Sequence, residues 1–184
     1  MNLLTVLFFG LAALWGVTQD KWAVADSATL RLAPAAFPQL PKNIVHYLQA
    51  RGCTIPQTYL ISEPHNVISG EFARRGQTDW AILCSRNEES SILVFWRGSA
   101  KSVAEIAEAP DRGFLQTITE GGKVGFSRLI EAVDRDYIIK HYEAYEGPKP
   151  PPIYHQGIND AYVEKASVVR YYYRGRWLEL QGAD

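Results

Sequence analysis

Cysteine is scarce in this sequence, which contains only two among its 184 residues. That number excludes a disulfide-dense small scaffold and a zinc site built from four cysteines. A surplus of charge of one sign is also lacking, because 19 basic side chains stand against 20 acidic ones and the formal net charge is −1. Proteins that bind nucleic acid usually carry an excess of Lys and Arg, so we expect no nucleic-acid partner.

The strings that mark common enzyme classes are also missing. The sequence has no G-x-S-x-G of a serine hydrolase, no H-E-x-x-H of a zinc protease and no C-x-x-C of a redox protein. Gly121-Gly122-Lys123 lacks the spacing and the hydroxyl residue of a phosphate-binding loop, so we interpret it as a hairpin turn. We therefore expect no cofactor and no metal, and the absences favour a non-enzymatic protein.

An uncharged apolar run opens the chain, from Leu3 to Val17. It is shorter than the roughly 20 residues that a membrane-spanning helix needs. The run fits a secretory signal peptide, and Ala23-Val24-Ala25 supplies a cleavage pattern before Asp26. The absence of Lys or Arg before the run is atypical of a signal peptide. The alternative is an uncleaved N-terminal anchor. We expect residues 1–25 to be the leader and 26–184 to be one exported domain, periplasmic or extracellular and monomeric.

Export determines how the two cysteines are interpreted. In an oxidising compartment, Cys53 and Cys84 are expected to form a structural disulfide. A catalytic Cys84 is the alternative, but this residue lies within an apolar strand pattern, where a thiol is usually inert.

The remaining pattern predicts an α+β domain, with two or three helices packed on an antiparallel β-sheet. Strands 79–85 and 91–97 are apolar on both faces, so we expect each face to be covered by a helix or a second layer. Ser102-Val103-Ala104-Glu105 matches a capping box and predicts a short helix that Pro110 ends. The other expected elements are helices 40–51 and 135–146, strand 65–72, and hairpins 113–119/123–130 and 167–173/176–180.

One short string resembles a known repeat. Gly70-Glu71-Phe72, Gly76 and Asp79 to Ile82 are similar to the FG-GAP or VCBS repeat, which forms part of a propeller blade and binds calcium through acidic loop residues. Ala73, Arg74 and Arg75 stand where those acids would be, so the resemblance implies local β structure without the calcium site. The chain as a whole resembles small exported bacterial proteins of unknown function.

Histidines and carboxylates provide the weak catalytic candidates. His155 and Asp160 lie in an expected loop before the last hairpin, and His65 lies near Glu71 and Asp79 in the sequence. Such groups can perform acid–base chemistry when they converge in a pocket. Solvated or turn-forming side chains are the alternative interpretation.

The C-terminal hairpin provides the candidate binding surface. Aromatic faces and planar guanidinium groups are frequent at protein and ligand contacts. The alternative is that the aromatic residues fill the core and the arginines cover its edge. The candidate residues are Arg170, Tyr171, Tyr173, Arg174, Arg176 and Trp177.

These observations predict an exported binding or structural module of the cell envelope or periplasm, with an unknown protein or envelope component as its partner. The alternative is a small hydrolase or metal-dependent enzyme that uses loop His and Asp residues.

Overall fold

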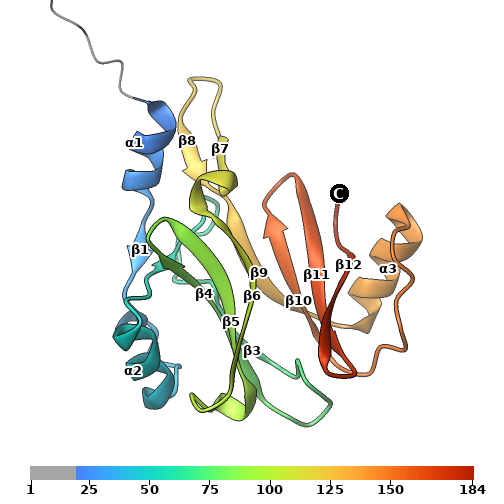
Figure 1. Ribbon diagram of the computed structural model, residues 1–184. Helices are drawn as coiled ribbons and strands as arrows, with labels where there is room; N and C mark the ends of the chain where they lie inside the picture. The colour runs from blue at the N-terminus through green and yellow to red at the C-terminus, as the bar shows by residue number, and fades with distance from the viewer. Residues whose placement is uncertain (1–19) are drawn as a thin grey trace, which may run out of the picture.

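The computed structural model describes residues 20–184, so the apolar run from Leu3 to Val17 lies outside the described residues (Figure 1). The fold combines α-helices with antiparallel sheets, and strands predominate. The helices are α1 (Lys21–Ala28), α2 (Lys42–Ala50) and α3 (Arg135–Tyr145), with three short 3-10 turns, η1 (Pro34–Ala36), η2 (Trp96–Gly98) and η3 (Asp111–Phe114).

The strands form two sheets of four strands each rather than the single sheet expected. The first sheet has the order β3 (Val67–Gly70), β4 (Asp79–Arg86), β5 (Glu89–Phe95) and β6 (Val103–Pro110). The second sheet has the order β12 (Arg176–Gln181), β11 (Ala166–Tyr173), β10 (Gly157–Tyr162) and β9 (Arg128–Val133). Two short ribbons complete the list, namely β1 (Arg31–Leu32) with β2 (Ile55–Pro56) and β7 (Leu115–Thr117) with β8 (Val124–Phe126).

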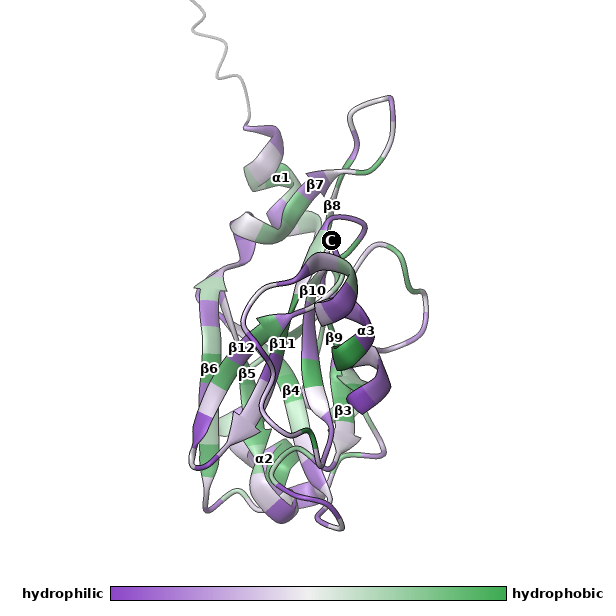
Figure 2. Ribbon diagram, turned by 90° about the vertical axis from the view of Figure 1, so that its right-hand side faces the viewer, coloured by the Kyte–Doolittle hydropathy of each residue, from purple (hydrophilic) through white to green (hydrophobic). Residues whose placement is uncertain are grey.

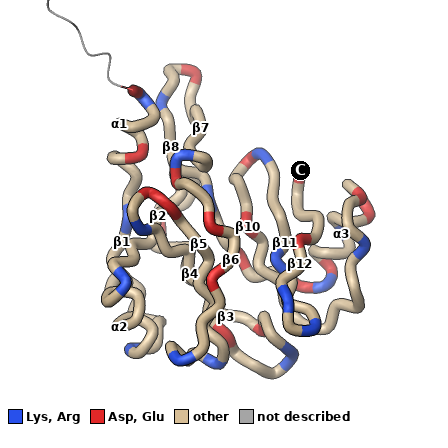
Figure 3. Tube along the Cα trace, viewed as in Figure 1, with Lys and Arg blue, Asp and Glu red and all other residues tan. Residues whose placement is uncertain are grey.

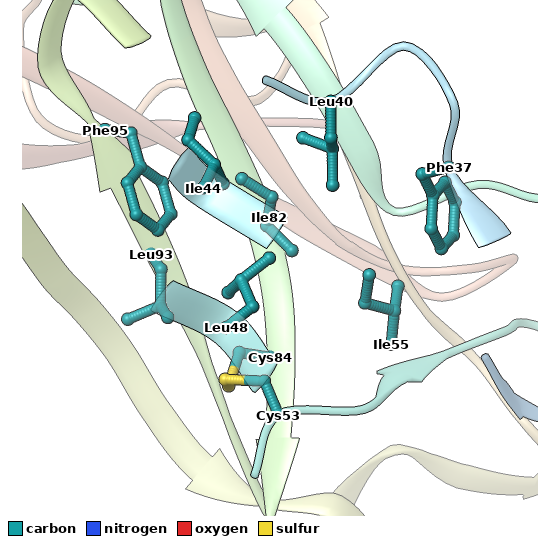
Figure 4. Packing of buried hydrophobic residues seen from close by; sticks show 10 residues of the cluster. All are labelled: Phe37, Leu40, Ile44, Leu48, Cys53, Ile55, Ile82, Cys84, Leu93 and Phe95. Atoms are coloured by element: carbon teal, nitrogen blue, oxygen red, sulfur yellow. A yellow bond between two sulfur atoms is a disulfide. The ribbon is translucent and has the colours of Figure 1, made fainter. Parts of the chain in front are cut away.

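Helix α2 covers the outer face of the first sheet. Ile44 and Leu48 lie four residues apart on the helix and pack against side chains of β4 and β5, among them Ile82 and Phe95 (Figure 4). The expected disulfide is present: Cys53, just after α2, bonds to Cys84 on β4, with a Cα–Cα distance of 5.3 Å. This bond attaches the end of α2 to the sheet.

The inner faces of the two sheets pack on each other. Successive side chains of a strand point to opposite faces, so Leu83 and Ile92 face the second sheet while Ile82 and Leu93 face α2. Ile130 and Ile158 contribute from the second sheet, and all these side chains are buried. The prediction that strands 79–85 and 91–97 are covered on both faces is therefore confirmed.

Helix α3 lies over the outer face of the second sheet, as Figure 2 shows from that side. Asp134 caps the helix by accepting a hydrogen bond from the backbone N–H of Tyr137. Ile138 is buried against Val169 and Leu180 of the sheet. The fold therefore has four layers, in the order α2, first sheet, second sheet, α3.

Two sequence-based predictions of local structure are wrong. The capping box at Ser102 does not start a helix, because residues 103–110 form β6 and Val103, Ala104 and Ile106 pair with β5. Pairing with a buried neighbouring strand outweighs a local helix signal of this kind. Residues 157–160, expected as part of a loop, belong to β10, an inner strand of the second sheet.

Helix α1 contains the expected cleavage position. The bond between Ala25 and Asp26 lies inside the helix, and Trp22 and Ala25 pack against the cluster between the sheets. Asp20 caps the helix and forms an ion pair with Arg112. Within residues 20–184, no helix has the length and apolarity required to cross a membrane.

Candidate functional site

Three aromatic rings meet where the two sheets approach each other beyond β5. Trp96 follows β5, whereas Tyr172 and Trp177 are paired residues on β11 and β12. The ring centroids of Trp96 and Trp177 are 5.7 Å apart with nearly parallel planes, and Trp96 and Tyr172 are 4.9 Å apart. All three side chains are only partly buried, so the cluster retains exposed aromatic surface.

The loops around this cluster lie side by side. The Nε of Arg97 donates to Gln77 in the β3–β4 loop at 3.1 Å, and its backbone N–H donates to Asp79 at 2.8 Å. These bonds place the β3–β4 loop next to the turn after β5, and Trp96 joins that turn to the β11–β12 hairpin. Residues distant in the sequence therefore form one continuous end of the molecule.

Exposed cations lie in the turns at this end of the molecule (Figure 3). Within residues 20–184 none of them forms an ion pair, although the Arg174 guanidinium lies over the ring of Tyr173. We call this surface the basic–aromatic end, and its residues are Trp96, Tyr172, Trp177, Arg74, Arg75, Arg97, Lys101, Arg174 and Arg176.

Only part of the predicted hairpin surface lies at this end. Arg174 and Arg176 are exposed there, and Trp177 belongs to the aromatic cluster. Tyr171 is not available for contact, because it is fully buried under α3 and its hydroxyl accepts a hydrogen bond from the Tyr154 backbone N–H at 3.0 Å. Burial also raises the pKa of Tyr171.

The other two hairpin candidates are engaged elsewhere. Tyr173 lies on the α3 side of the second sheet, next to the cluster that contains Tyr171. Arg170 lies on the opposite side, where it binds Glu179 and Asp160. The alternation of side chains along β11 therefore separates residues that the sequence presents together.

The structure does not bring His155 and Asp160 together. His155 stacks on Tyr171, with centroids 4.4 Å apart, on the α3 side of the second sheet. Asp160 is in β10 rather than a loop, and its side chain lies between the sheets, where it forms an ion pair with Arg128 at 2.9 Å. The two groups consequently occupy opposite faces of one sheet.

His65, Glu71 and Asp79 also serve separate roles. The Nε2 of His65 accepts a hydrogen bond from the Thr58 backbone N–H at 2.7 Å, and Nδ1 donates to the Glu63 carbonyl at 2.8 Å. Asp79 is completely buried and accepts hydrogen bonds from the backbone of the neighbouring loops. Through these contacts, His65 and Asp79 fix the conformation of the neighbouring loops.

Glu71 and His155 do share a surface cavity of about 470 Å³, which Arg75 and Asp134 also line. It is open and mixed in charge, and no Ser or Cys nucleophile lies among its lining residues. In the part of the chain that the structure describes, no group of three His, Cys, Asp or Glu side chains is arranged to hold a metal ion.

Sequence reasoning missed Trp96, Arg97 and Tyr172 as members of the site. Trp96 and Arg97 end a predicted strand that was expected to be covered on both faces, and the contact of Trp96 with Trp177 depends on how the sheets pack. The excess of Lys and Arg in three separate turns was the available signal.

A scan of protein-family models, a search of curated proteins and a search of solved structures found no match to this chain.

Proposed function

We propose that this chain is an exported, non-enzymatic binding module of the cell envelope, and that its basic–aromatic end holds an anionic, sugar-containing polymer. The observation that carries the proposal is that cations without an ion pair within residues 20–184 gather at the same end of the molecule as partly exposed, stacked rings, although the net charge of the chain is −1.

The chemistry of the side chains favours this ligand class. Guanidinium groups bind phosphate, sulfate and carboxylate groups through paired N–H donors. Aromatic faces supply rigid apolar area on which the C–H faces of sugars can lie. The separation of His155 from Asp160 supports binding rather than hydrolysis.

The test compares two polymers that differ only in charge. We expect the full chain to bind dextran sulfate and not dextran, with an affinity that falls as salt rises because exposed charges are screened. The double variant Arg174→Gln/Arg176→Gln should bind about tenfold more weakly, which corresponds to about 1.4 kcal/mol.

The matched control is Lys21→Gln/Lys123→Gln, which removes two exposed cations, one at the start of α1 and one just before β8. Trp96→Leu tests the aromatic contribution, with circular dichroism to verify the fold. Equal binding to both polymers, or an equal loss in the control, would refute the proposal.

A further inference from the structure

A second cavity, of about 470 Å³, opens on the outer face of the second sheet. Strands β9, β10 and β11 form its floor, and Tyr137 is the residue of α3 that lines it. It lies on the face opposite to the side chains of Trp177 and Tyr172, so it is distinct from the basic–aromatic end. Its lining residues include Leu129, Glu131, Tyr137, Asn159 and Ala161.

The most informative of these residues is Asn159, in the middle of β10. Its side chain is only 3% exposed, and its Nδ2 donates to Glu131 Oε2 at 3.3 Å. Its Oδ1 is buried and has no hydrogen-bond partner within residues 20–184. A buried acceptor of this kind is unfavourable unless something donates to it, and an apolar residue would fill the same place on the strand without that cost.

The charge of the cavity indicates which donor fits. Glu131 is exposed and forms no ion pair within the described residues. The cation of the cavity, Lys165, is held over the ring of Tyr162 at 4.3 Å and donates to its hydroxyl. Within the described residues, the Glu131 carboxylate therefore has no cation paired with it, and it lies next to Asn159 Oδ1, an acceptor without a donor.

The rest of the lining is suited to the apolar part of a ligand. Leu129 and Ala161 line the floor, and the ring of Tyr137 lies against His141 with centroids 4.0 Å apart. The contact with His141 restricts the orientation of the Tyr137 ring. An aromatic face also attracts a cation.

We infer that this cavity binds a small organic cation with a primary ammonium group. The ammonium group pairs with the Glu131 carboxylate and donates a hydrogen bond to Asn159 Oδ1, while the carbon skeleton lies on Leu129 and Ala161 beside Tyr137. The inference concerns a different face and a ligand of opposite charge, so it does not depend on the proposed function.

The first experiment uses three probes of similar shape. Tyramine carries the ammonium group, 4-hydroxyphenylethanol is neutral, and 4-hydroxyphenylacetate is an anion. In a ¹H–¹⁵N NMR titration of the full chain, we expect tyramine alone to shift the side-chain amide of Asn159 and the backbone amides of β9 and β10. Glu131→Gln should weaken the binding of tyramine at least tenfold, whereas Glu143→Gln, an exposed change on α3 outside the cavity, should leave it unchanged.

Asn159→Leu separates a binding role from a structural one. We expect this variant to lose tyramine binding and to have an unchanged or raised Tm, because the unpartnered acceptor is removed. Equal shifts with all three probes, no shift with tyramine, or unchanged tyramine affinity in Glu131→Gln would overturn the inference. A folded Asn159→Leu variant with unchanged affinity would also overturn it.

Discussion

The guanidinium group of Arg128 donates two hydrogen bonds to the carboxylate of Asp160, from Nε to Oδ1 at 2.9 Å and from Nη2 to Oδ2 at 3.0 Å. The same guanidinium reaches across to the first sheet, where it donates to the carbonyls of Ser90 and Ala107. Arg128 is 1% exposed, and Ala107 has a positive φ of 55° where β6 departs from regular pairing with β5. Arg128 therefore joins the two sheets at this irregularity.

We expect Arg128→Met to be strongly destabilising. It removes the main partner of a buried carboxylate and leaves two carbonyls without their donor, so the loss should be about 3–5 kcal/mol. Urea unfolding of the purified variant measures it. Arg135→Met, which changes an exposed arginine, is the control and should alter the free energy of unfolding by less than about 0.5 kcal/mol. A similar small change in Arg128→Met would contradict the role of this residue.

The disulfide should contribute substantially to stability. Cys53 and Cys84 are 31 residues apart, and closing a loop of that length contributes about 3–4 kcal/mol on the chain-entropy estimate. We expect Cys53→Ser/Cys84→Ser to be destabilised by roughly this amount. The unmodified chain under reducing conditions should approach the double variant, and a chain whose unfolding is insensitive to reductant would argue against the bond.

Stability should fall in mildly acidic solution because of His65. Burial lowers the pKa of His65 below its ordinary value of 6.5, outweighing the opposite effect of the Glu63 carbonyl. The folded state thus favours the neutral ring, so this contribution is present above pH 6.5 and is lost as the pH falls through the lowered pKa. Protonation also prevents Nε2 from accepting the hydrogen bond of Thr58.

Urea unfolding between pH 7.5 and pH 5 provides the measurement for His65. His65→Gln should flatten the pH profile, whereas His46→Gln, a change on the exposed face of α2, should not. Identical profiles for the unmodified chain and His65→Gln would show that another group is responsible.

Helix α1 should stabilise the domain. A chain that begins at Asp26 lacks the Asp20 cap and the packing of Trp22, so we expect it to be less stable than the full chain by about 2 kcal/mol. A chain that begins at Asp20 retains both features and is the control. If the two shortened chains unfold at the same temperature, residues 20–25 contribute nothing to the fold.

Much of the fold could be predicted from the sequence because its strands and helices have strong local signals. The apolar side chains on both faces of residues 79–85 predicted that a helix or a second layer covers each face, and helix α2 and the second sheet provide this coverage. The presence of two cysteines in an expected exported domain predicted the disulfide. The strand β6 could not be predicted, because it depends on pairing with β5 rather than on its own composition. Strand β10 was not predicted, because Asn159 and Asp160 are polar residues of the kind that is typical of loops.

The candidate site was only partly predictable for a related reason. Arg174, Arg176 and Trp177 are adjacent in the sequence and were found together. Trp96 reaches them only through the packing of one sheet on the other, which no local pattern records. Tyr171 is not at the surface, because α3 covers the face of β11 on which Tyr171 lies.

Helix α1 and the basic–aromatic end lie at opposite ends of the strands, since α1 contacts η3 after β6 and Trp96 begins the turn before it (Figure 1). An eight-residue strand such as β6 spans about 26 Å. At physiological ionic strength the field of a charged surface is screened over about 8 Å. A charged surface at the α1 end of the domain therefore lies too far away to attract the arginines at the basic–aromatic end.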